Sequence, residues 1–574
     1  MPAPDSRQVR IEFDQRVPMR DGITLAADVY KPLSRSGEPG RFPVILTRTP
    51  YLRLSEGILM VARYFAERGF VFVAMDVRGR GDSEGVFVPY FNEGEDGYDA
   101  IEWCAAQPWS DGNVGTIGSS YPGVIQWLAA LQQPPHLRAM VVRVAPSDPF
   151  VETPTGVPSP ISLCWLHFVS GRYNQLMEAV EWEKVYEHLP LLTMDKRAGR
   201  HIPHWRTEIA HAQLDEFWQP ICYQHKFERV DVPALHISGW YDDEQIGTPL
   251  NFMGMQAHGA TQAARNSQRM LMGPWGHVVN KDSKLGEVDF GPQALIDLRG
   301  EELRWFNRWL RGYGSEIGLN EAPVRIFVMG ANEWRDEREW PLARTQWTTY
   351  YLHSSGRANS RFGDGTLSTT QSSAAEPADH YRYDPARPVP FITELTSSQI
   401  GGPDDYAAIE HRDDVLVYIT EPLTADTEVT GPIKVDLYAS SSAPDTDFTA
   451  KLLDIWPTGF RQRLCDGMVR ARFRDGMDKP SLIEPGKIYH YMIDCWNTAQ
   501  VFKAGHSIGL EISSSAFPKY DRNLNTGAPL GVTVEIAVAE QRIYHDVEHP
   551  SALVLPVIPK EDNGSPLSGD DDYF

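Results

Sequence analysis

Strand-like and helical segments alternate along residues 43–145, and this alternation constrains the fold more than any other feature of the chain. Apolar runs rich in β-branched residues occupy residues 43–51, 71–77, 113–118 and 139–145. Between these runs, residues 58–70 and 95–107 repeat apolar side chains at three- and four-residue spacing, as amphipathic helices do. The sequence therefore predicts a parallel sheet that is covered by helices.

The alternation stops after Pro146 and resumes near Pro233. The intervening segment, residues 148–229, is rich in Trp and His and contains no strand-like run, so we expect a helical cap inserted into the sheet domain. The resumed pattern predicts strands at residues 234–242, 269–277 and 324–330, and helices at 250–258 and 301–310. We accordingly assign residues 1–147 and 230–345 to the two parts of one α/β core.

Beyond residue 345 the sequence turns to short β-rich runs separated by Gly, Pro, Ser and Asp. These runs lie at residues 415–420, 431–442, 448–457, 487–494, 506–515 and 531–539. Many strands at short spacing are typical of antiparallel sandwiches, so residues 346–574 are predicted to form a jelly-roll β-sandwich domain.

The chain of 574 residues carries a formal net charge of -23. This charge opposes binding to nucleic acid and to anionic membrane surfaces, because both depend on clustered Lys and Arg. The opening residues have no apolar signal region and no window is long enough to span a membrane, so a cytoplasmic location is expected. The oligomeric state is left open, with a homodimer as one option.

Residues 114–123, Val-Gly-Thr-Ile-Gly-Ser-Ser-Tyr-Pro-Gly, predict a strand, a tight turn and the start of a helix. A serine at such a turn stands clear of the sheet, where the next backbone N–H can stabilise an oxyanion. Ser119 and Ser120 both lie here, but only Ser120 has a glycine two places before it and precedes the helix. The usual pattern is G-x-S-x-G, whereas this chain has Pro122 and then Gly123.

A serine nucleophile needs a base that a carboxylate orients, in the chain order Ser, Asp, His for this kind of fold. Asp242 follows the strand predicted at 234–241, and His277 follows the strand predicted at 269–276. Both positions lie at carboxyl ends of strands, where loops converge on an active site. Ser120, Asp242 and His277 are therefore the predicted triad, and activity should fall on acidification as His277 protonates, at about pH 6.5 before any shift.

Seven motifs, spread over nearly the whole chain, carry a resemblance to one enzyme family. They are PMRDGITLAADVY at 18–30, RTPY at 48–51, DVRGRGDSEG at 76–85, GSSYPG at 118–123, GWYD at 239–242, GPWGH at 273–277 and SSSAFPKYDRNLNTG at 513–527. In these motifs the sequence resembles the X-Pro dipeptidyl-peptidase-like serine hydrolases, in the branch that contains bacterial cocaine esterase and the α-amino-acid ester hydrolases.

The resemblance implies an α/β-hydrolase core, a helical cap and a C-terminal jelly roll. It also implies that Ser120, Asp242 and His277 form the triad. Tyr51 of the RTPY motif matches the tyrosine whose hydroxyl joins the backbone N–H of Tyr121 in the oxyanion hole.

From the residues themselves we expect no cofactor and no metal, because GRGDSEG at 79–85 is one residue off the dinucleotide fingerprint and His201 and His204 lack a third ligand candidate at zinc spacing.

The substrate is less well defined than the chemistry. Asp243 and Glu244 continue the acidic run after Asp242, and they are either solvated loop charges or a partial match to the carboxylate cluster of the α-amino-acid ester hydrolases. In the second case Glu244 would pair with a substrate ammonium, although Gln245 lacks the next charge and the cap offers no evident third carboxylate. Trp165 is the cap residue expected to line the pocket.

The predicted function is a serine carboxylesterase that acts on a small-molecule ester, with α-amino acid esters included. The alternatives within enzymes are an X-Pro dipeptidyl aminopeptidase and an amide acylase. The alternative outside enzymes is a non-catalytic protein whose jelly roll binds carbohydrate.

Overall fold

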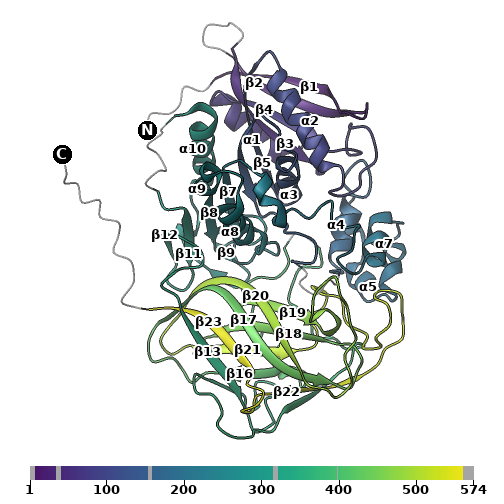
Figure 1. Cartoon of the computed structure of the whole chain (residues 1–574), viewed down its shortest axis with the longest axis vertical. Helices are drawn as coiled ribbons and strands as arrows, with labels where there is room; N and C mark the ends of the chain where they lie inside the picture. Colours follow the sequence, from purple (N-terminus) through teal and green to yellow (C-terminus); the bar gives the residue numbers. More distant parts are fainter. Residues whose placement is uncertain (1–6, 34–39, 153–157, 314–320, 397–398, 560–574) are drawn as a thin grey trace, which may run out of the picture.

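A computed structural model describes residues 7–33, 40–152, 158–313, 321–396 and 399–559 (Figure 1). Its first sheet has ten strands in the order β1-β2-β4-β3-β5-β6-β7-β8-β11-β12. The strands are β1 Val9–Pro18, β2 Thr24–Pro32, β3 Phe42–Thr49, β4 Val71–Asp76, β5 Ser110–Ser119, β6 Leu137–Arg143, β7 Ala234–Gly239, β8 Arg269–Gly273, β11 Val324–Val328 and β12 Glu333–Glu337. From β4 to β11 all neighbours are parallel, and β1, β2 and β12 add antiparallel edges.

Helices cover both faces of this sheet, as the alternating pattern predicts. The core helices are α1 Glu56–Glu67, α2 Glu93–Ala106, α3 Tyr121–Ala130, α8 Gly247–His258, α9 Gln262–Asn266 and α10 Leu298–Arg311. Neighbouring residues of β3 point to opposite faces, so Ile45 packs with α1 and α10 whereas Val44 and Leu46 pack with α2 and α3. The sheet is therefore packed between two apolar layers, one beneath the helices of each face, which is the arrangement of the α/β-hydrolase fold.

Short helices fill the insertion between β6 and β7, at the right of Figure 1. They are α4 Ser162–Phe168, α5 Trp182–Tyr186, α6 Met194–Arg197 and α7 Pro203–Ala210. Their own apolar cluster, centred on the buried side chains of Trp182 and Trp205, packs them together. The insertion is helical as expected, while its boundaries at residues 148 and 229 stay predictions.

The C-terminal part is a second, mostly antiparallel sheet with its own core, below the first in Figure 1. Its strands are β13 Gln346–His353, β14 Thr366–Ser368, β15 Asp379–Tyr383, β16 Leu416–Ile419, β17 Thr427–Ser441, β18 Asp447–Ile455, β19 Arg461–Arg470, β20 Tyr489–Phe502, β21 Ser507–Ser513, β22 Ala539–Tyr544 and β23 Ala552–Ile558. A β-rich domain is thus confirmed, and its jelly-roll topology and its start at residue 346 stay predictions. The strand predicted at 531–539 is wrong except for its last residue, Ala539, where β22 begins.

Backbone hydrogen bonds join the two sheet domains. The N–H of Met329, after β11, donates to the carbonyl of Ala499 in β20, and Val501 donates back to Met329. The Arg335 guanidinium of β12 also pairs with Glu428 of β17. The β-rich domain therefore lies firmly against the loops at the carboxyl ends of the core strands. Within the described residues, no helix is long and apolar enough to cross a membrane.

Candidate active site

Ser120 occupies a strained turn between β5 and α3. Its φ of 63° and ψ of -129° lie in a region that non-glycine residues rarely adopt, and its N–H donates to the carbonyl of Arg143 at 3.0 Å. A Cβ at Gly123 would lie 2.8 Å from that same carbonyl oxygen, and one at Gly118 would lie 2.6 Å from the Pro122 side chain. Close packing therefore requires glycine at both positions. Gly123, which lies one place later than in the usual G-x-S-x-G pattern, keeps the turn tight.

Pro122 is compatible with this turn because it falls in the first turn of α3, where its missing N–H has no helical partner to lose. Ser119, the rival serine, is the last residue of β5 and stands opposite Arg143 in the sheet. Only Ser120 is therefore at the turn itself.

The loops after β7 and β8 bring Asp242 and His277 into contact. Asp242 Oδ1 lies 2.8 Å from His277 Nδ1, and Asp242 Oδ2 accepts a hydrogen bond from Ser238 Oγ at 2.7 Å. The N–H of Glu244 also donates to Asp242 Oδ1 at 3.2 Å. A carboxylate held at both oxygens fixes the imidazole, so that Nε2 is the nitrogen left for proton transfer.

The side chain of Ser120 interacts with the Tyr51 hydroxyl and the Glu244 carboxyl. Over the described part of the chain, no hydrogen bond links Ser120 Oγ to His277 directly. Hydrogen bonds between a nucleophile and its base are often long in free enzymes and tighten with substrate. The structure thus places the predicted residues in two contacting groups, Asp242 with His277 and Ser120 with Tyr51.

Tyr51 lies just beyond β3, with its hydroxyl against the backbone of Tyr121 and the indole of Trp165. Trp165 Nε1 donates to this hydroxyl at 3.0 Å. Burial raises the pKa of Tyr51 to about 12, so its phenol stays neutral at physiological pH and keeps a proton to donate. Because the oxygen accepts from two N–H groups, the O–H is directed elsewhere, toward Ser120.

Arg80 of the DVRGRGDSEG motif supports the segment that carries Tyr51. Its fully buried guanidinium donates to the carbonyl of Pro50 at 2.7 Å and to that of Val169 in the cap at 2.9 Å. Asn174 Oδ1 accepts from the same guanidinium, while Asn174 Nδ2 donates to the Tyr51 carbonyl at 3.2 Å. This motif therefore ties the end of β3 to the cap.

Three carboxyl groups gather beside the Asp242–His277 pair: Glu152, Asp243 and Glu244. Burial and their mutual repulsion raise the pKa of Glu152 to about 8 and the pKa of Glu244 well above its usual range. Glu244 Oε2 and Asp243 Oδ1 are buried without a hydrogen-bond partner. Across the described residues, no Lys or Arg forms an ion pair with Glu152 or Glu244. Among these residues Glu152 and Glu244 thus lack a Lys or Arg partner, whereas Asp243 Oδ1 lies 3.5 Å from His277 Nδ1.

Glu152 is the carboxylate that the sequence did not reveal. It lies in the segment after β6, with one oxygen accepting from the N–H of Ser147, and not in a cap helix. In the sequence, Glu152 could have been found from its position after a predicted core strand, which places it at the same edge of the sheet as Ser120 and Asp242.

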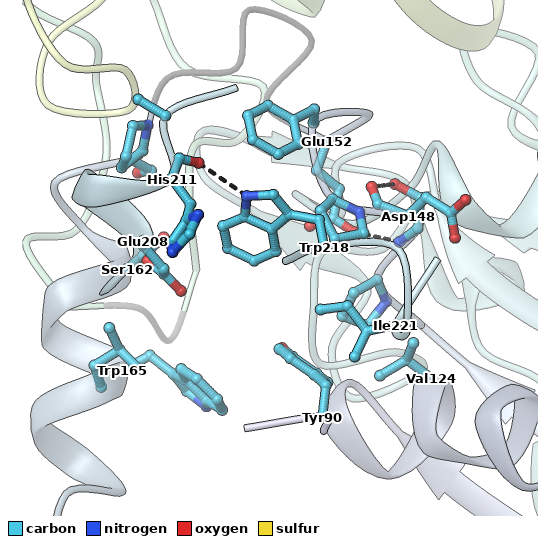
Figure 2. Close-up of a pocket in the computed structure, with 18 of the residues that line it drawn as sticks. Tyr90, Val124, Asp148, Glu152, Ser162, Trp165, Glu208, His211, Trp218 and Ile221 are labelled. Atoms are coloured by element: carbon cyan, nitrogen blue, oxygen red, sulfur yellow. Dashed lines mark hydrogen bonds between the residues drawn. The ribbon is translucent and has the colours of Figure 1, made fainter. Parts of the chain in front are cut away.

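A cavity of about 190 Å³ opens beside this group, between the cap and the loop after β6 (Figure 2). Trp165 lines it and stacks on Tyr121 at 5.8 Å between ring centroids. The rest of the wall includes Tyr90, Glu152, Glu208 and Trp218. The cavity thus combines aromatic faces with carboxylates, which suits an aromatic ligand that carries a positive charge.

Asp242, Asp243 and His277 are the residues here that come closest to a metal-ligating set, with donor atoms within 4.8 Å of one another. His277 Nδ1 and both Asp242 oxygens already bond within the protein, so this donor set fits a proton relay better than a cation site.

The charges around His277 set the expected pH dependence. Burial disfavours its charged form, but the carboxylates of Asp243 and Asp242 outweigh burial and raise the pKa of His277 to about 9. A general base must be neutral, so kcat/KM is lost as the pH falls through this pKa, above the free histidine value of about 6.5. Asp243→Asn removes one of the charges that stabilise the protonated imidazole. The acid limb of the pH profile, where kcat/KM falls, should therefore move to lower pH.

Asp282→Asn is the control, because Asp282 is an exposed carboxylate on the loop that carries His277. It should leave the acid limb of the pH profile unchanged. Measuring kcat/KM from pH 5 to 10 for the three proteins tests the assignment. An acid limb that Asp243→Asn does not move would contradict it.

A serine at a strained strand–helix turn, beside an Asp–His pair on a mostly parallel sheet with helices on both faces, is the architecture of an α/β-hydrolase enzyme. Comparison with known proteins narrows this class. The X-Pro dipeptidyl-peptidase (S15 family) model matches residues 21–279, and the X-Pro dipeptidyl-peptidase C-terminal non-catalytic domain matches residues 318–554. The chain therefore belongs to the S15 family of serine hydrolases.

Individual relatives agree with this assignment. The cocaine esterase of Rhodococcus sp. (strain MB1 Bresler) is 38% identical, over 94% of this chain and 97% of its own length. A solved α-amino acid ester hydrolase superposes with a TM-score of 0.84 at 26% identity, covering 97% of this chain and 98% of that one. An aminopeptidase from a marine sediment archaeon, Thaumarchaeota archaeon, gives a TM-score of 0.84 at 25% identity, over 96% and 97%.

Proposed function

We propose that this protein hydrolyses carboxylic esters through an acyl-enzyme on Ser120. The observation that carries the proposal is the strained turn of Ser120 at the same sheet edge as the hydrogen-bonded Asp242–His277 pair. Ser120 Oγ attacks the ester carbonyl while His277 Nε2 takes its proton, and His277 then protonates the departing alcohol. Water, deprotonated by His277, attacks the acyl-enzyme and releases the acid and Ser120.

Tyr51 and Tyr121 form the proposed oxyanion hole. The Tyr51 hydroxyl already contacts both the Ser120 side chain and the backbone N–H of Tyr121, so the two donors converge beside the nucleophile. In the free protein the Tyr121 N–H donates to the Tyr51 oxygen and the Tyr51 O–H is directed toward Ser120, so both donors exchange these partners for the oxyanion as Ser120 attacks.

We further propose that the preferred acyl group carries an α-ammonium. The carboxyls of Glu152 and Glu244 are buried, repel each other and have no Lys or Arg partner in the described part of the chain, so an ammonium would relieve their repulsion and be held beside Ser120. Two solved structures that superpose over nearly the full chain are named for an α-amino acid ester hydrolase and an aminopeptidase. The aromatic wall formed by Trp165 and Tyr90 suits an aromatic side chain on the same acyl group.

The test compares kcat/KM for a phenylglycine methyl ester and for the same ester without its amino group. We expect the wild-type protein to prefer the amino ester by about tenfold or more, since a buried charged hydrogen bond contributes about 1.5–3 kcal/mol. Glu244→Gln and Glu152→Gln should each remove most of this preference, whereas Glu208→Gln, in the same cavity but next to His204, should keep it. Equal values for the two esters in the wild-type protein would refute the amine preference and leave ester hydrolysis intact.

The same carboxyls could anchor the free N-terminus of a peptide, which keeps X-Pro dipeptidyl aminopeptidase and amide acylase activity as the second candidate. The family description and the aminopeptidase relative favour it. Release of the aniline from an X-Pro anilide, measured beside the ester panel, ranks the two activities. Membership in a hydrolase family argues against the non-catalytic carbohydrate-binding alternative, while the cytoplasmic location and the homodimer stay predictions.

A further inference from the structure

The loops that carry Asp242 and His277 lie against each other along their backbones. The N–H of Trp240 donates to the carbonyl of Gly273 at 2.9 Å, and the N–H of Tyr241 donates to the carbonyl of Trp275 at 3.0 Å. Beyond these two bonds the loops diverge, and the imidazole of His277 depends on how its own backbone is held.

A single side chain of the β-rich domain bridges the two loops at this point. The amide oxygen of Gln399 accepts a hydrogen bond from the backbone N–H of His277 at 2.9 Å. Its amide nitrogen donates to the carbonyl of Tyr241, the residue before Asp242, at 3.0 Å. One planar amide therefore fixes the spacing between the backbones of both members of the Asp–His pair.

The approach of Gln399 leaves no room for any side chain at position 276. A Cβ on Gly276 would lie 2.6 Å from Gln399 Cδ and 2.7 Å from Nε2, and closer still to Oε1. Gly276 has an ordinary φ, so its lack of a side chain is explained by this amide and not by its backbone conformation. The close approach of the Gln399 amide therefore accounts for Gly276, the second glycine of the GPWGH motif.

Gln399 is itself anchored within its own domain. Its amide nitrogen also donates to the carbonyl of Gly401 at 2.6 Å, and the hydroxyl of Thr393 donates to the Gln399 carbonyl at 3.2 Å. The N–H of Gly401 donates back to the Thr393 hydroxyl at 3.1 Å. The β-rich domain therefore anchors Gln399 through Thr393 and Gly401, and a second contact, from Gln462 to the Tyr241 hydroxyl at 3.0 Å, supports the loop that carries Asp242.

We propose that Gln399 is a positioning residue for His277, so that the β-rich domain takes part in the reaction by fixing the catalytic imidazole. This inference rests on the proposed hydrolase mechanism. A base that shifts by about 1 Å from its productive position can lose about a hundredfold in rate, so a loosened His277 loop should lower kcat more than substrate binding.

The first test replaces Gln399 with methionine, which keeps the length of the side chain and removes its hydrogen bonds to His277, Tyr241 and Gly401. We expect kcat for a good ester to fall by about tenfold or more, with KM changed by less than about threefold. Gln399→Glu keeps an acceptor for the His277 N–H, so it should recover part of the loss. Its added charge, together with Asp242, Asp243 and Glu152, should move the acid limb of kcat/KM to higher pH.

Gln541→Met is the matched control, because Gln541 is a buried amide of the same domain whose side chain donates to Thr446 and Ser514. It should lower the melting temperature without lowering kcat. If Gln399→Met and Gln541→Met reduce kcat equally, the effect is one of domain stability and the proposal is overturned.

A double-mutant cycle tests the contact itself. Gly276→Ala should lower kcat in the wild-type background because its methyl group displaces the Gln399 amide, but it should cost little when Gln399→Ala has already removed that amide. Additive losses would overturn the proposal. A wild-type protein without Ser120-dependent hydrolysis would instead refute the proposed function, so the two failures are distinguishable.

Discussion

Replacing Ser120 with alanine is expected to lower ester turnover by about 10⁴-fold or more, because removing the nucleophile of a triad leaves only binding and the oxyanion hole. Ser120→Ala also removes the hydroxyl that contacts Tyr51 and Glu244, while the backbone bond from residue 120 to the Arg143 carbonyl stays available. The variant should therefore fold and still bind substrate.

Steady-state kinetics on a phenylglycine ester and a simple aryl ester measure the effect, with circular dichroism as the check on folding. Ser119→Ala is the matched control, one residue earlier and at the end of β5, and it should retain turnover within about tenfold. Comparable losses in both variants would contradict the assignment of Ser120 over Ser119.

Tyr51→Phe is expected to lower kcat by about 10²–10³-fold with the fold intact, because one oxyanion donor contributes about 2.7–4 kcal/mol in the transition state. KM should change little, since the Tyr51 hydroxyl would bond the oxyanion more strongly than the ground-state carbonyl. The variant keeps the ring of Tyr51 and its contact with Phe168, so packing is preserved.

Tyr90→Phe provides the comparison, because Tyr90 lines the neighbouring cavity and stacks on Trp165 without contacting Ser120. We expect it to keep kcat within about threefold. Near-normal ester turnover by a folded Tyr51→Phe protein would rule out its role in the oxyanion hole.

The core of the fold could be predicted from the sequence because each strand–helix pair is a local pattern. The strand before Ser120 carries Gly118 two places before the serine, as a tight turn requires, and the strands before Asp242 and His277 are short, apolar and bounded by Gly or Pro. In a parallel sheet such strand ends meet at one edge, so the proximity of Asp242 and His277 followed from topology alone.

Contacts between distant segments could not be predicted in this way. Glu152 and Gln399 reach the site from an irregular loop and from the other domain, and no periodicity identifies either of them. Residues 531–538 show the opposite error. Their alternation of Val and Ile is typical of a strand, yet the side chains of Val532 and Val534 are 49% and 58% exposed and no partner strand pairs with them among the described residues.

From the sequence, the acidic run after Asp242 has two interpretations, and its surroundings in the structure argue against solvated loop charges, while the binding of a substrate amine stays a proposal. Solvated loop charges would keep ordinary pKa values, whereas burial together with Glu152 raises the pKa of Glu244. Whether the Glu244 carboxyl is solvated or buried depends on how distant loops pack, and the residues next to it in the sequence do not reveal that.

Covalent labelling by a fluorophosphonate tests the central claim most directly, because the reagent reacts with a serine only where a neighbouring base has activated it. We predict a single adduct on the peptide that contains Ser120, formed in step with the loss of ester hydrolysis and absent from Ser120→Ala. Full inactivation with the adduct on another residue, or equal labelling of Ser120→Ala, would contradict the account.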